Sequence, residues 1–149
     1  VLGNSSNTTG INYTIAIGKD ALKALTTGAG NIAIGYNSGD LITTGARNVG
    51  LGYNSLGASG GSALTGDDNI CIGFQAGLAM EQAANRNILI GSYAGDGQTV
   101  ADDSVFIGHA VGTATVTTDA NGSVGLGNYA LNALTSGEHN IAIDIIHSS

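Results

Sequence analysis

A five-residue unit recurs along the chain and constrains its fold more than any other feature. Each unit has a small polar residue, an aliphatic residue, a variable residue, a second aliphatic residue and then Gly. Seven copies end at Gly18, Gly35, Gly52, Gly73, Gly91, Gly108 and Gly127, and an eighth, NIAID, covers residues 140–144. A fragment of an earlier copy ends at Gly3. Because successive copies lie 15 to 21 residues apart from one end to the other, the whole chain is one repeat array.

The two aliphatic positions of each unit lie two residues apart, which is the side-chain period of a β-strand. Ile15 with Ile17 and Ile32 with Ile34 are examples, and all eight full units follow the rule. We therefore expect eight short strands whose paired aliphatics form the interior wall. The closing glycines are expected to turn the chain at a corner through positive φ, which Gly adopts without a Cβ penalty. The opening Asn residues are expected to stack as ladders between neighbouring copies.

Coils of 17 to 21 residues with one strand each predict an all-β fold, a parallel β-solenoid of the β-helix or β-roll kind with about nine coils. A helical repeat is disfavoured because Gly interrupts every window of helical length, although one or two helical turns could form at 77–86. The 149 residues are expected to be a single repeat domain, a fragment of a longer fibrous protein.

A second, weaker apolar pattern follows each closing Gly. Small residues stand three positions after it, and larger apolar residues such as Leu25, Ile42 and Met80 stand seven after it in several coils. These positions predict a poorer wall facing the strands. The third positions of the units, from Ala16 to Ala142, would then point outward, yet they are mostly small or apolar. Since a solvated strand face is normally polar, we expect another copy of the chain to cover that outer face.

Charge and composition exclude several functions. Eleven Asp and Glu against four Lys and Arg give a formal net charge of -7, which disfavours nucleic acid as a partner. No apolar stretch approaches the length of a transmembrane helix, so no membrane insertion is expected. The single cysteine, Cys71, occupies a third position and is interpreted as a small buried hydrophobe.

No set of residues predicts catalysis, a cofactor or a metal site. His109, His139 and His147 belong to different coils. The pairs at 67–68 and 102–103 supply adjacent Asp residues without a calcium-loop spacing, and are interpreted as solvated turn carboxylates. We therefore expect a protein that is not an enzyme.

One constellation stands out as a candidate binding site. Tyr36, Tyr53 and Phe74 each follow a closing Gly directly, so stacked coils would place their rings in a column at intervals of about 4.8 Å. Such a column could contact a receptor, for example by stacking on sugar rings. The alternative is a ladder that stabilises the coil stack or packs between chains.

The units NIAIGYNSG (31–39), NICIGFQAG (69–77) and SVGLGNYAL (123–131) resemble the head repeats of trimeric autotransporter adhesins. Segment 21–56, ALKALTTGAGNIAIGYNSGDLITTGARNVGLGYNSL, is even more similar to repeats of bacteriophage tail-fibre and tail-spike proteins. The similarity covers nearly the entire chain. The common spacing of 17 residues is longer than that of adhesin heads, which favours the fibre.

This resemblance implies a homotrimeric, non-enzymatic attachment segment of a phage tail fibre, located in the virion tail outside the cell. Its implied partners are further copies of itself, a host cell-surface glycan or protein, and other tail or fibre proteins. The alternative is the head of a bacterial trimeric adhesin on the cell surface. A third option is an ice-binding solenoid, suggested by threonine pairs at several corners.

Overall fold

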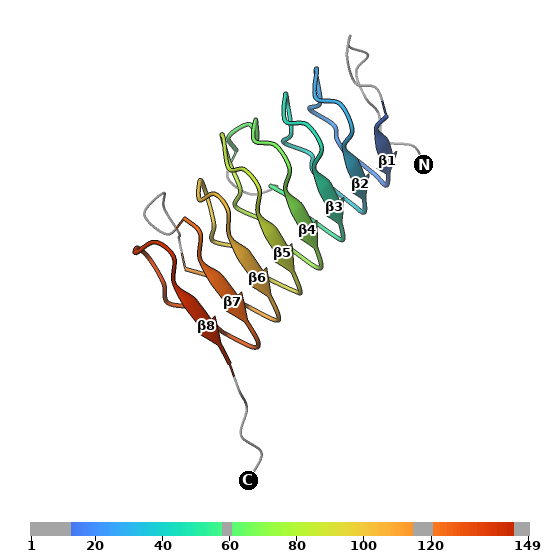
Figure 1. The fold of residues 1–149 in the computed structure, drawn as a ribbon. Coiled ribbons are helices and arrows are strands. Elements are labelled where there is room, and N and C mark those ends of the chain that lie inside the picture. Colours follow the sequence, from blue (N-terminus) through green and yellow to red (C-terminus); the bar gives the residue numbers. More distant parts are fainter. Residues whose placement is uncertain (1–12, 58–60, 115–120, 145–149) are drawn as a thin grey trace.

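The computed structural model describes residues 13–57, 61–114 and 121–144, and within them the chain is a parallel β-solenoid (Figure 1). Each repeat unit contributes one three-residue strand to a single sheet in sequence order. The strands are β1 (Ile15–Ile17), β2 (Ile32–Ile34), β3 (Val49–Leu51), β4 (Ile70–Ile72), β5 (Ile88–Ile90), β6 (Val105–Ile107), β7 (Val124–Leu126) and β8 (Ile141–Ile143). The described residues thus form eight rungs, and the partial copy at 1–3, which would add the ninth coil, lies outside them.

The register of the sheet is the register of the repeat. Ile15 pairs with Ile32, Ile32 with Val49, and the equivalent residues pair at every later step. In Figure 1 the strands follow one another along one side of the stack, and the connecting loops extend away from them. No helix forms among the described residues, including 77–86, where the backbone instead makes turns and a bridge. The predicted solenoid and its coil spacing are confirmed.

The prediction of which strand face is buried was wrong. The third-position side chains lie inside the solenoid: Ala33, Cys71, Leu89 and Phe106 are fully buried. The paired aliphatics point outward, and none of the sixteen is buried. Alternation within a strand separates two faces, but it does not say which face meets the rest of the coil.

The interior is a thin layer that the third positions share with the second wall. Ala21, Leu22, Leu25, Ile42, Leu56, Leu64 and Met80 are among the residues that pack there. Across this layer, a large side chain on one wall faces a small residue on the other. Where the third position is large, as at Leu89 and Phe106, Gly95 and Gly112 stand opposite, and a Cβ on either glycine would collide with that side chain. Where it is Gly, as at Gly50, Ser38 and Leu56 occupy the space.

The closing glycines are required by close packing between coils as well as by their dihedral angles. Gly35 has φ +140, and a Cβ there would lie 2.1 Å from the carbonyl oxygen of Gly52 in the next coil. Gly52 stands in the same relation to Gly73, at 2.3 Å. No side chain fits in so small a space, so the predicted corner role of these glycines is confirmed.

The opening asparagines form a buried ladder that fixes the other corner. Asn69 donates from Nδ2 to the Ala84 carbonyl at 2.8 Å and to Asn48 Oδ1 at 3.0 Å. Its own Oδ1 accepts from the backbone N–H of Asn87 at 3.1 Å. Because a buried polar group must be paired, each Asn satisfies backbone groups in two neighbouring coils. The ladder predicted from the sequence is therefore present.

Candidate binding surfaces

The outward face of the sheet is an apolar surface formed by the sixteen paired aliphatics, which we call the aliphatic face. Its end residues are the most open: Ile141 and Ile143 expose 74% and 59% of their surface. Central members such as Ile72 are half-buried, because each side chain is covered only by its neighbours above and below. A contiguous apolar surface running the length of a chain marks an interaction site.

The predicted aromatic column forms along the corner that follows each strand. Parallel stacking brings the Tyr36 and Tyr53 rings to a centroid distance of 5.0 Å with 19° between their planes. Tyr53 and Phe74 stack at 5.6 Å and 16°. The three rings are exposed by 37%, 48% and 42%, so the column lies on the surface.

The column continues beyond the residues that the sequence singled out. Tyr93 meets Phe74 edge-to-face at 5.3 Å, and His109 then lies between Tyr93 and Tyr129 at 6.0 and 5.3 Å. Tyr93 and Tyr129 stand two residues after the closing Gly rather than one, so a column predicted from the position directly after Gly did not include them. A search for an aromatic residue at either position would have found them.

The faces of the stacked rings are occupied by neighbours. The Lys19 ammonium lies 5.6 Å from the centroid of Tyr36, whose ring also stacks on Tyr53. Tyr53 has a ring on both sides, and Phe74 has Tyr53 on one side and Tyr93 on the other. The column therefore offers a ligand ring edges and tyrosine hydroxyls rather than open faces, and its rings stabilise one another.

A charged column occupies the corner that precedes β3, β4, β5 and β6, and we call it the ion-pair edge. The Arg47 guanidinium binds Asp68 through Nε at 2.6 Å and Nη2 at 2.8 Å, and reaches Asp67 at 3.1 Å. Arg86 binds Asp103 in the same way at 2.5 and 2.9 Å. The guanidinium groups hold the pKa values of Asp68 and Asp103 below their usual range. The carboxylates interpreted as simply solvated are thus ordered by arginines one coil away.

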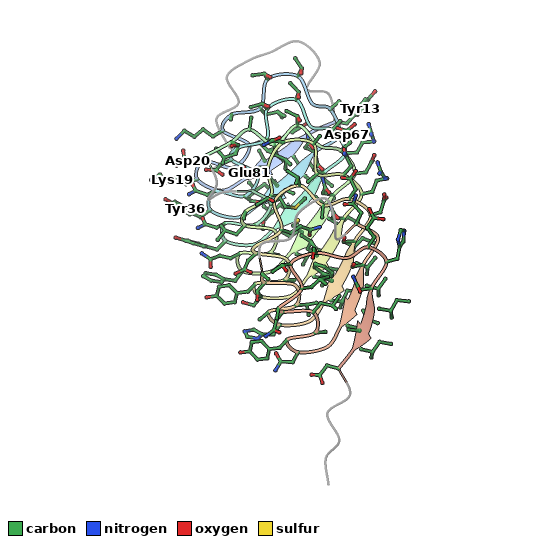
Figure 2. All side chains as sticks on the ribbon, turned by 90° about the vertical axis from the view of Figure 1, so that its left-hand side faces the viewer. Tyr13, Lys19, Asp20, Tyr36, Asp67 and Glu81 are labelled. Carbon is green, nitrogen blue, oxygen red and sulfur yellow. The ribbon has the colours of Figure 1, made fainter. Side chains whose placement is uncertain are left out.

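The aromatic column and the ion-pair edge border the aliphatic face on opposite sides. Figure 2 shows Lys19 and Tyr36 along one side of the solenoid and Tyr13 and Asp67 along the other. This separation follows from the repeat, because the two columns stand just after and just before each strand. One chain therefore presents an apolar strip with an aromatic border and a charged border.

Burial raises the pKa of further titratable groups, among them Asp40 and Cys71. Partial burial raises the pKa of Asp40 to about 6, although Lys23 opposes the shift. Cys71 is fully buried 3.5 Å from the Met80 sulfur, and desolvation raises the pKa of its thiol far above the usual value. The thiol is therefore protonated and inaccessible, which fits the predicted role of a buried hydrophobe.

In the described segments, no three His, Cys, Asp or Glu side chains gather in a way that could hold a metal ion. Nor is there a helix, in the same segments, that is long and apolar enough to cross a bilayer. Comparison of the chain with models of known protein families, with curated proteins and with solved structures finds no match.

Proposed function

We propose that this chain is a non-enzymatic structural and attachment segment of a phage tail fibre that works as a homotrimer. The observation that supports the proposal is the aliphatic face. Eight rungs at about 4.8 Å give it a length of about 34 Å, and no part of the chain that the structure describes covers it. A contiguous exposed apolar surface of that extent is typical of a surface that another molecule covers.

The shape of the coil favours three copies. Each strand has only three residues, and two of its side chains point outward. The aliphatic face is therefore a narrow strip at one side of the coil, with the loops extending away from it (Figure 1). Three such strips can converge on a common axis and bury one another, leaving the loops outside for contact with a host surface. Rigidity follows from the stack, since every coil is hydrogen-bonded to the next.

Trimerisation is tested by light scattering of the purified chain and of an Ile72→Arg variant. Ile72 lies in the middle of the aliphatic face, and the substitution places a charge in the proposed interface. We expect a trimer mass for the unchanged protein and a monomer mass for the variant, with the far-UV circular dichroism of both the same. Thr44→Arg, on an exposed loop, is the matched control and should remain trimeric. A monomeric unchanged protein would refute the proposal.

Attachment is tested separately with a triple variant in which Tyr36, Tyr53 and Phe74 become Ser. Fluorescently labelled protein is incubated with candidate bacterial cells, and its melting temperature is measured in parallel. Lost cell binding with an unchanged melting temperature would assign the column to receptor contact. Because the rings cover one another's faces, we expect a lower melting temperature, which assigns the column to packing and moves receptor contact to the loops.

A further inference from the structure

We propose that the aromatic column of each chain packs against the ion-pair edge of the next chain, so that the guanidinium groups of Arg47 and Arg86 donate hydrogen bonds to the Tyr53 and Tyr93 hydroxyls of the neighbouring copy. This inference rests on the proposed trimer. A three-fold ring is built from heterologous contacts, in which one surface patch meets a different patch of the next subunit. The patches available on the two sides of the aliphatic face are these two borders (Figure 2).

The two borders meet rung by rung if the three-fold axis is parallel to the solenoid axis, because rotation about that axis leaves the height of a residue unchanged. The partner of each residue is then found within its own coil. Arg47 precedes β3 and Tyr53 follows it, and Arg86 and Tyr93 stand in the same relation to β5. Level pairs in neighbouring chains are therefore Arg47 with Tyr53 and Arg86 with Tyr93.

Residues at the same height on the two borders have complementary chemistry in other rungs as well. In the first rung the cation and the ring exchange sides, with Tyr13 on the charged border and Lys19 on the aromatic one. In the sixth rung Asp103 is level with His109, an imidazole that can donate to a carboxylate. A cation is thus level with a tyrosine in three rungs, and an acid is level with an imidazole in one.

Three more rungs are compatible with close contact. Gly30 is level with Tyr36 and Gly122 with Tyr129, so the charged border leaves room where the aromatic border has a ring and no cation faces it. Asp68 is level with Phe74. The edge of an aromatic ring carries positive potential, which suits a carboxylate better than the ring face would.

Both guanidinium groups are already held for such a contact. Two hydrogen bonds to Asp68 fix the plane of the Arg47 guanidinium, and two to Asp103 fix that of Arg86. The arginine side chains nevertheless remain 58% and 54% exposed. These bonds use Nε and Nη2, and each guanidinium carries further N–H donors that can reach a tyrosine hydroxyl of the neighbouring chain.

The borders add area to a narrow strip. Each strand has three residues, or about 10 Å of extended chain. A strip about 34 Å long and about 10 Å wide has roughly 340 Å² per chain before the borders are counted, against about 800 Å² per partner in a standard interface. The borders enlarge an interface that the aliphatic face begins.

The experiment uses paired cysteines and a short bis-maleimide cross-linker. Arg47→Cys with Tyr53→Cys in one chain places thiols on opposite borders, and a link within one chain would leave a monomer band. In the trimer they meet between chains, so we expect a covalent trimer on a denaturing gel. Arg86→Cys with Tyr93→Cys repeats the test two rungs away, in case one variant folds poorly. The native Cys71 is buried with a raised thiol pKa and stays unmodified.

The controls separate this inference from the trimer itself. Single-cysteine variants and the offset pair of Arg86→Cys with Tyr53→Cys should not cross-link. A trimer mass by light scattering with no cross-link from either level pair would overturn the inference but leave the proposed trimer standing. Cross-linking by a single-cysteine variant, or only by the offset pair, would overturn it as well. A monomer mass for the unchanged protein would overturn both proposals.

Discussion

Truncating Leu89 should reduce the stability of the single chain, whereas truncating Ile90 should mainly reduce association between chains, although the two residues are adjacent and of equal size. Leu89 is fully buried against Gly77 and Gly95, whereas Ile90 belongs to the aliphatic face and is half-buried. We expect Leu89→Ala to destabilise the chain itself. We expect Ile90→Ala to weaken association while destabilising the single chain much less than Leu89→Ala does.

The magnitude for Leu89→Ala comes from two contributions. Removing three buried carbons costs about 2.4 kcal/mol at about 0.8 kcal/mol each. The backbones at Gly77 and Gly95 are held by hydrogen bonds to the following coil and cannot collapse far. A residual cavity of roughly 60 Å³ at about 24 cal/mol per Å³ adds about 1.5 kcal/mol, so the total is about 4 kcal/mol. Ile90→Ala removes the same number of carbons from a half-exposed site and should cost about 1 kcal/mol in the monomer.

Urea denaturation at several protein concentrations distinguishes the two effects, because stability that comes from association depends on concentration. Leu89→Ala should lower the unfolding midpoint at every concentration. Ile90→Ala should lower it mainly where the unchanged protein is associated. If Ile90→Ala cost as much as Leu89→Ala at the lowest concentration, with a midpoint independent of concentration, the assignment of the outward face would be wrong.

Three further predictions concern the corners and one carboxyl. Gly52→Ala puts a Cβ 2.3 Å from the next coil's carbonyl oxygen and should lower the free energy of unfolding by more than about 3 kcal/mol, measured by urea denaturation. At Gly61 a Cβ would have nothing within 4 Å, so Gly61→Ala should cost only about 1 kcal/mol from its positive φ. Asn69→Ala removes four buried hydrogen bonds and should cost about 2 to 4 kcal/mol. Asn69→Ser should be milder because Ser occupies this position in two other coils, and equal losses would contradict the ladder. Because the pKa of Asp40 is raised from 3.8 to about 6, the folded state binds a proton more tightly than the unfolded state, and stability should fall as pH rises from about 4 to 6. Asp40→Asn should therefore raise the melting temperature at pH 7 and leave it unchanged near pH 4, and a constant difference across that range would refute the assignment.

The aromatic column could be predicted from the sequence, because it depends only on the position of each residue within its repeat unit. Tyr36, Tyr53 and Phe74 share one position, and parallel stacking in register necessarily makes them a column. The ion-pair edge could not be found in the same way. Arg47 and Asp68 lie 21 residues apart, and the insertion between them hides the fact that both precede an opening Asn. Aligning the coils on that Asn makes the alternation of Arg and Asp visible.

The sequence alone determined the coil length, the strand positions, the parallel register and the glycine corners, because each is a local requirement repeated in every unit. Only the tertiary structure decided which strand face is inside. That choice depends on the space between the strand and the second wall, which holds one side chain per rung and not the paired aliphatics. The compensation between Phe106 and Gly112, and between Gly50 and Leu56, shows this limit. Whether a side chain belongs to the core or to a surface for another copy is thus fixed by the volume that the closed coil leaves, which alternation along a strand does not reveal.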